Sequence, residues 1–232
     1  MAITFFRQRR PGPEMSVENA VACQIPNLFR SDEYPLWAAG SPAIGAGRPD
    51  LVVVSCEPAV YALANVEMPT AQILAYLRAV GRARPKTISE RIGKPVEVII
   101  KHLEGLQEAD VVSVSADVYM LCPSWRNILP EIVTIEVKVS DWRKALSQAA
   151  RNRIFAHRSF IALPADVANR IRKQPVLGKL GIGVLAVGEQ DEVKITREAR
   201  RRKPRVWTYY YQLAHIVATH FTGASDAVCR VA

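Results

Sequence analysis

The chain has 232 residues, and its 31 lysines and arginines outnumber its 22 aspartates and glutamates, which gives a formal net charge of +9. Hydrophobic residues make up 49% and charged residues 23%, a balance that excludes wholesale disorder. No apolar run approaches the roughly 20 residues of a membrane-spanning helix, and no apolar stretch follows the arginines near the start, as a secretory signal requires. The positive charge predicts an anionic partner, nucleic acid first.

The cysteines and histidines give no sign of a disulfide or zinc framework. Four scattered cysteines form no C-x-x-C pair, and four histidines form no H-E-x-x-H motif. We therefore expect free thiols in a reducing compartment, and hence a cytoplasmic protein. We also expect no membrane contact and no small-molecule cofactor.

Taken in chain order, the predicted elements alternate between helix and strand. Residues 16–29 predict a helix capped by Ser16 that ends near Gln24 because of Pro26. A loop is expected through Gly47, and residues 51–54 form a short apolar, β-branched run typical of a buried strand. After a block at 70–121, residues 132–139, a long helix, and strands at 160–163 and 182–187 complete an α/β pattern.

The block at 70–121 carries its own pattern of caps and turns. Thr70 can cap a helix closed by Gly81, a short helix over 87–92 precedes Gly93, and Pro95 suits the start of a third helix. Residues 110–114 and 117–121 then predict two strands. This arrangement resembles the winged helix-turn-helix of many regulators, so the predicted domains are 68–121, inserted, and 1–67 with 122–232 as a discontinuous core.

In winged helices the third helix enters the major groove of DNA. That resemblance implies that Lys94 and Lys101 contact nucleic acid. The net charge of only +1 over 68–121 is weak for phosphate binding, so the competing interpretation is a module for protein contact or packing.

Three residues outside this block point to a chemistry. Asp50 precedes the apolar run at 51–54, and Glu136 and Lys138 lie two apart on the predicted strand 132–139, which places them on one face. Such charges on a buried strand are costly unless they have a partner or a task. Two carboxylates suit a hard cation such as Mg²⁺ or Mn²⁺, and a nearby lysine can stabilise charge that develops on a phosphodiester.

This set resembles the PD-(D/E)xK nuclease superfamily, with Pro49-Asp50 as the first element and Glu136-Val137-Lys138 as the second. The resemblance covers roughly 14–60 and 130–190. It implies a restriction-endonuclease-like mixed β-sheet flanked by helices, with Asp50, Glu136 and Lys138 as catalytic residues. It also implies a further catalytic residue, Gln148, on the helix after Lys138. On the same helix Asn152 stands where members of the family frequently have a tyrosine. The resemblance further implies a metal ligand at Glu18, with Glu14 as the alternative.

Two other segments imitate these elements. Glu192-Val193-Lys194 repeats the spelling of the second element but has no capped amphipathic helix after it. Asp117 lies closer in sequence to Glu136 than Asp50 does, but it falls in the predicted wing without a preceding proline. Asp50 and Glu136 therefore remain the predicted pair.

The basic character belongs to residues 122–232, which hold nineteen basic and nine acidic side chains. Its densest part is 197–205, and we expect this run to contact nucleic acid. The aromatic residues at 207–211 suit either base stacking or a core. The nucleic-acid-binding residues predicted in this run are Arg200, Arg201, Arg202 and Lys203.

The sequence as a whole predicts a metal-dependent DNA endonuclease, with DNA as partner and a homodimer as one possible assembly. The alternatives are a non-catalytic DNA-binding regulator or interaction protein on a degenerate nuclease fold, and an unrelated α/β protein with a surface pair between Glu136 and Lys138.

Overall fold

The computed structural model describes residues 3–9, 11–45, 47–64 and 70–221. Contacts divide the chain into two compact units. One, the sheet unit, is built from the residues up to Cys56 and from Glu131–Arg205. The other, the helical unit, is built from Glu57–Pro130 and the segment that starts at Val206. The helical unit thus extends beyond the predicted 68–121 on both sides and takes in residues 206–221, which the sequence placed in the core.

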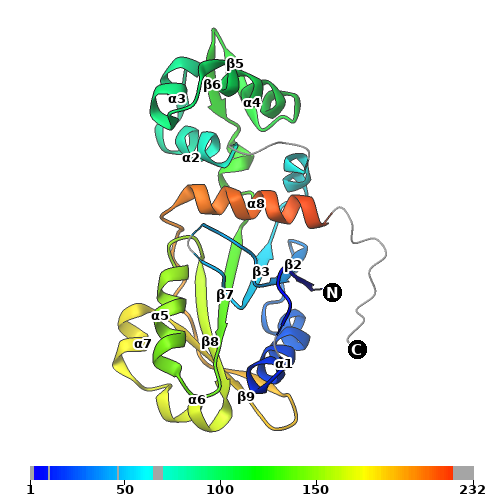
Figure 1. Ribbon diagram of the computed structural model, residues 1–232, viewed down its shortest axis with the longest axis vertical. Helices are drawn as coiled ribbons and strands as arrows, with labels where there is room; N and C mark the ends of the chain where they lie inside the picture. The colour runs from blue at the N-terminus through cyan, green and yellow to red at the C-terminus, as the bar shows by residue number, and fades with distance from the viewer. Residues whose placement is uncertain (1–2, 10, 46, 65–69, 222–232) are drawn as a thin grey trace. The chain divides into compact units, whose positions relative to one another are not determined.

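The sheet unit holds a seven-stranded mixed sheet flanked by helices, which confirms the α/β class (Figure 1). The pairs β1/β2, β7/β8 and β8/β9 are parallel, and the other pairs are antiparallel. In spatial order the strands are β1 (Thr4–Phe5), β2 (Leu36–Gly40), β3 (Leu51–Ser55), β7 (Glu131–Val137), β8 (Arg158–Pro164), β9 (Gly183–Val187) and β10 (Val193–Arg197).

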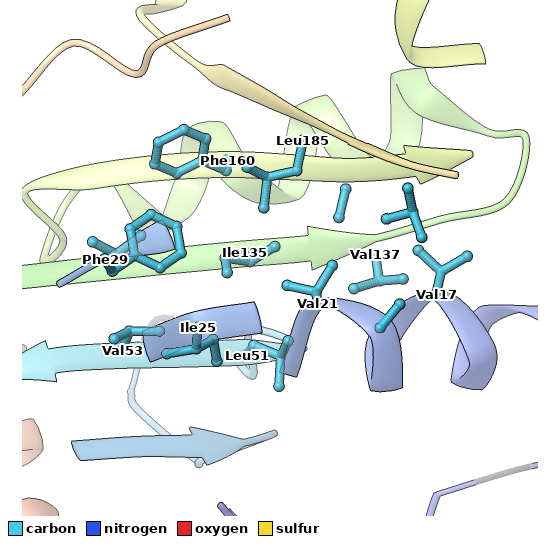
Figure 2. Close-up of a cluster of buried hydrophobic side chains, with 14 of the residues drawn as sticks. Val17, Val21, Ile25, Phe29, Leu51, Val53, Ile135, Val137, Phe160 and Leu185 are labelled. Carbon is cyan, nitrogen blue, oxygen red and sulfur yellow. The ribbon is translucent and has the colours of Figure 1, made fainter. Parts of the chain in front are cut away.

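Helices cover both faces of this sheet. Helix α1 (Pro13–Leu28) packs on one face, and α5 (Trp142–Asn152), α6 (Ala165–Ile171) and α7 (Pro175–Leu180) pack on the other. Figure 2 shows the α1 side, where apolar side chains of the helix meet those of β3, β7, β8 and β9. The ring of Phe29 meets that of Phe160 edge-on, with centroids 5.5 Å apart. Because successive side chains of a strand point to opposite faces, alternate residues of β7 and β8 face the α1 layer and the layer of α5, α6 and α7.

Helix α1 differs from its prediction at both ends. It begins at Pro13, three residues before the predicted cap, and continues through Pro26 to Leu28. Proline removes one backbone N–H from a helix and normally ends or bends it. Here Ile25 and Phe29, on either side of Pro26, are buried against the sheet, and this packing keeps the last turn helical.

The second difference is β2, which lies within the predicted loop. Its sequence, Leu-Trp-Ala-Ala-Gly, has little of the β-branched character that marks strands. The strand forms because it is paired on both sides, with β1 and β3. A Cβ at Gly40 would collide with the ring of Phe5, its partner on β1, so glycine is needed at this position. Tertiary pairing therefore overrides local preference here.

The helical unit contains the predicted elements of 70–121 and several others. Gly81 and Gly93 end α2 and α3 with φ of 86° and 73°, as the turn residues predict. A short strand before α3 completes a three-stranded antiparallel sheet in the order β4-β6-β5. The elements are η1 (Pro58–Leu63), α2 (Thr70–Val80), β4 (Arg82–Ala83), α3 (Pro85–Ile92), α4 (Val96–Glu108), β5 (Val112–Ser115), β6 (Val118–Leu121), η2 (Pro123–Asn127) and α8 (Trp207–Phe221).

Helix α8 packs on α2 and η1 and carries all the aromatic residues at 207–211. Tyr210 and Tyr211 are each 1% exposed, so the core interpretation of their rings is confirmed. The Tyr210 hydroxyl lies 2.7 Å from the Leu129 N–H that it accepts, and the guanidinium of Arg78 lies 3.5 Å from the centre of the Trp207 ring. Across the described residues, α8 included, no helix combines the length and apolarity needed to span a membrane.

Candidate functional site

Asp50 and Glu136 lie next to each other at one end of the paired strands β3 and β7. The antiparallel register sets Leu51 opposite Ile135, so the residue before Leu51 and the residue after Ile135 come together. The Val137 N–H donates to Asp50 Oδ2 over 2.7 Å, and the carboxyl groups of Asp50 and Glu136 are within hydrogen-bonding reach of each other. Glu136 is 1% exposed. The strand pair thus holds two carboxyl groups in contact, one of them fully buried.

Lys138 joins the same site directly after the end of β7. Its amine donates to Val137 O over 2.6 Å and to Glu14 Oε2 of α1 over 3.3 Å. It lies 3.8 Å from Asp50 Oδ2. Glu136 is hydrogen-bonded to α5 and lies close enough to Lys138 for their charges to interact. The amine thus adjoins the carboxylates, and the shared face of Glu136 and Lys138 stays a prediction.

Helix α1 adds two carboxylates to the site. Glu14 pairs with Lys138, and Glu18 is close enough to Asp50 for their charges to interact. Both line a pocket of about 420 Å³ that also contains Asp50 and Lys138. The structure therefore brings Glu18, the predicted ligand, and Glu14, the alternative, into one pocket. Glu18, Asp50 and Glu136 together form the acidic site.

Cations that the sequence did not single out line the same pocket. They are Arg7 and Arg9, from the segment after β1, and Lys144, from the first turn of α5. Arg9 donates to the Asn19 side chain of α1, and its guanidinium lies 4.0 Å from the centre of the Phe5 ring. The pocket thus combines acidic side chains with a positive border, and only the fold could reveal this because the residues are remote in sequence.

On the far side of β7, α5 presents two amides toward the sheet. Asn152 is 4% exposed and donates from Nδ2 to Glu136 Oε1 over 2.6 Å. Gln148, one turn earlier on the same helix, has a buried Oε1 without a hydrogen-bond partner. Asn152 is therefore a site residue that sequence reasoning noted only as a departure from a pattern. Its spacing of four from Gln148 was the signal that marked the shared helix face.

The carboxyl groups of the acidic site hold their protons more tightly than ordinary carboxyls. Burial, followed by the charge of Asp50, raises the pKa of Glu136 to about 8 and that of Glu18 to about 7. Burial also raises the pKa of Asp50, against the opposing effects of the Val137 N–H and the Lys138 amine. A cation that binds these carboxyls would have to displace the protons that Glu136 and Glu18 retain near neutral pH.

The fit of a divalent cation can be tested on the oxygen atoms themselves. Glu136 Oε2 is buried and has no hydrogen-bond partner, which is costly unless another group satisfies it. Oxygen-only donors match the preference of Mg²⁺ and Mn²⁺. Within the described part of the chain, however, no three His, Cys, Asp or Glu side chains are arranged as a set of ligands. The residues fit a hard cation by chemistry, while their side chains are not gathered around one point.

The predicted nucleic-acid contacts occupy two other places. Lys94, just before α4, and Lys101, within it, are exposed on the helical unit. The run at 200–203 follows β10 on the sheet unit and is exposed throughout. Arg201 differs from its neighbours because its guanidinium binds Glu131 Oε2 over 2.8 Å. Its charge is therefore already partly neutralised.

Comparisons with known proteins identify no relative. No family model matches the chain, and no curated protein or solved structure matches it. A function therefore has to be inferred from the geometry of the site.

Proposed function

We propose that this protein is a metal-dependent endodeoxyribonuclease related to the PD-(D/E)xK superfamily. One observation carries the proposal. Asp50 and Lys138, predicted from two segments separated by most of the helical unit, lie 3.8 Å apart at a strand end, and the carboxyl of Glu136 adjoins that of Asp50. A chance surface pair would require neither the buried Glu136 nor the raised pKa values around it.

The residues have distinct roles under this proposal. Asp50, Glu136 and Glu18 would hold Mg²⁺ or Mn²⁺, which when bound polarises a phosphodiester and lowers the pKa of a coordinated water. Lys138, anchored by the Val137 carbonyl, places its positive charge beside the carboxylates and stabilises negative charge on the phosphate. Asn152 orients Glu136 through its hydrogen bond, and Gln148 is a further polar group on the same helix.

For the helical unit we propose a winged helix-turn-helix that positions DNA. The succession of α2, α3 and α4, followed by the hairpin β5–β6, supports this role. Helix α4 would be the recognition helix, with Lys94 and Lys101 exposed at its start and on its surface. Weak net charge in this unit favours orientation of the substrate over tight binding.

A second candidate is a DNA-binding protein whose nuclease-like site no longer acts. The absence, among the described residues, of a converged set of three metal-ligating side chains favours it. The two candidates differ in one measurable property, which is divalent-metal binding at the acidic site.

The test is cleavage of supercoiled plasmid with Mg²⁺ or Mn²⁺ by the protein and by variants. Asp50→Asn and Glu136→Gln should abolish nicking, and Lys138→Ala should slow it by about 10²–10³-fold, the usual cost of removing one group that stabilises developing charge. The matched control is Glu192→Gln with Lys194→Gln, because these residues repeat the E-V-K spelling at the start of β10. Nicking that survives Glu136→Gln would reject the site.

Binding of Mn²⁺, followed by electron paramagnetic resonance, separates the two candidates without relying on activity. The nuclease predicts a bound-ion signal that Asp50→Asn removes. A folded protein that binds DNA but no Mn²⁺ would support the second candidate.

A further inference from the structure

A second pocket, unrelated to the acidic site, lies in the sheet unit at the ends of α5 and α7. It has a volume of about 170 Å³ and is bordered by the segment after β10. Five of its seven lining residues are basic and none is acidic. We call it the basic pocket. Its lining residues are Ala150, Arg153, Lys179, Leu180, Arg202, Lys203 and Arg205.

Residues 199–205, which we call the basic segment, have a backbone that is fixed in place along this pocket. Its backbone N–H groups at Arg200, Arg202 and Arg205 donate to carbonyls of Gly181, His157 and Ile154 over 3.1, 2.9 and 2.8 Å. Its two apolar residues, Ala199 and Pro204, are buried. The segment has no regular secondary structure, yet its cations project from an anchored backbone. The backbone that carries these cations is therefore ordered before any ligand arrives, which lowers the entropy cost of binding.

Arg153 forms the floor of the basic pocket. It is 8% exposed, and its Nη2 lies 3.4 Å from the carbonyl of Arg200, a long hydrogen bond. Burial lowers the pKa of Arg153, and the charges of Arg202, Arg200 and Arg205 lower it further. Gly181 leaves room for the guanidinium, since a Cβ there would lie 2.7 Å from Arg153 Nη1. Among the residues that the structure describes, this buried guanidinium has like charges around it and no carboxylate to pair with.

The described residues do not neutralise this cluster. None of the five basic side chains pairs with an Asp or Glu that the structure describes. The C-termini of α5 and α7 offer about half a negative charge each, against five full positive charges. Within the described part of the chain the pocket therefore keeps a large positive excess, which a bound anion would balance.

We propose that the basic pocket binds a phosphate group. Guanidinium groups form paired, charge-assisted hydrogen bonds with phosphate oxygens, and the volume lies below the roughly 300–1,000 Å³ of sites that enclose whole small molecules. The pocket thus fits the phosphate and leaves the rest of its carrier outside. The phosphate belongs either to the backbone of a nucleic-acid strand or to a free phosphate. Phosphate binding in this pocket does not depend on nuclease activity at the acidic site.

The experiment compares two double variants that remove the same charge from exposed positions of the sheet unit. Lys179→Gln with Arg202→Gln alters the basic pocket, and Lys173→Gln with Lys194→Gln lies outside it. Inorganic phosphate is titrated by calorimetry at constant ionic strength, with sulfate and acetate as comparison anions. We expect the pocket variant to lose at least about tenfold in phosphate affinity, the size of one missing charge-assisted hydrogen bond, while the control stays within about twofold of the unaltered protein.

A second arm measures duplex DNA binding without divalent metal as a function of salt. One backbone phosphate in the pocket predicts that the slope of log K against log [salt] falls by about 0.9 in the pocket variant and not in the control. A loss of phosphate affinity with an unchanged slope assigns the pocket to a free phosphate. If the two double variants agree in both arms, the proposal is overturned. Failure of plasmid nicking alone leaves it standing.

Discussion

At the scale of single residues, Glu136 makes the stability of the fold depend on pH. Between its ordinary pKa of 4.5 and the folded value of about 8, the folded protein keeps a proton on Glu136 that the unfolded chain releases. Stability should therefore fall as pH rises through this window, by at most about 1.4 kcal/mol per pH unit. Below pH 4.5 this dependence should vanish, since both states are then protonated.

The variant Glu136→Gln should remove that loss. A glutamine keeps an oxygen for the Asn152 amide, and its own amide can donate to Asp50, so the packing survives. We expect the variant to be more stable than the unaltered protein at pH 8 and nearly equal to it at pH 4.5. Urea unfolding at several pH values measures the difference. A constant offset across pH would contradict the assigned pKa.

Asn152 gives a second prediction at this scale. Its hydrogen bond lowers the pKa of Glu136, so Asn152→Ala should raise that pKa and shift metal binding and cleavage to higher pH. The pH midpoint of plasmid nicking measures the shift. Ser159→Ala, on the neighbouring strand β8, is the control because it removes a buried hydroxyl paired with Thr134 rather than with the acidic site. A lower rate with the same midpoint would show that Asn152 only supports the fold.

At the scale of elements, helix α1 contains a proline that we expect to lower its stability. Pro26 is exposed and lies inside the helix, where it replaces a backbone hydrogen-bond donor. Pro26→Ala should restore the bond to Ala22 O and raise the free energy of unfolding by about 2 kcal/mol. Gln24→Ala, in the same turn, should change it little. Denaturant unfolding of both variants checks this, and a destabilised Pro26→Ala would mean that the native backbone depends on the proline.

The elements also show how much of the fold and of the site could be predicted from the sequence. Asp50 and Glu136 were predictable because each adjoins a β-branched apolar run, and such runs pair. Strand β2 and the role of Asn152 were not predictable. An Ala-Gly segment becomes a strand only when neighbouring strands pair with it, and the Asn152 amide acquires its partner only when α5 docks on the sheet. The partners of Lys138 show the same limit, since Glu14 reaches its amine only when α1 docks on the sheet.

At the scale of the whole molecule, charge is distributed unequally between the two units. If nucleic acid is the partner, the anchored basic segment should provide most of the phosphate contact. Arg200→Gln with Arg202→Gln should reduce the salt slope of DNA binding by about 0.9 for each phosphate that the variant no longer neutralises, and Lys94→Gln with Lys101→Gln should reduce it less. Arg201 is left intact because Glu131 already binds it. An equal or larger reduction of the salt slope by the Lys94 and Lys101 substitutions would instead assign the phosphate contacts to the helical unit.

The helical unit depends on a segment remote in sequence. The Tyr210 hydroxyl accepts from the N–H and donates to the carbonyl of Leu129, both buried. Tyr210→Phe should leave these groups without a partner and cost about 1–3 kcal/mol. Tyr209→Phe is the control, because Tyr209 is only half-buried. Thermal unfolding compares the two, and equal melting temperatures would contradict the assigned role of the hydroxyl.

This dependence on α8 has a consequence during synthesis. A ribosome that adds about 5–20 residues per second finishes α2 on the order of ten seconds before it finishes α8. Until then the apolar surface of α2 and η1 has no helix to cover it, and β10 itself is completed only 24 residues before α8. The nascent chain therefore passes through a state with an open helical unit, whose apolar surface is accessible to chaperones and to aggregation.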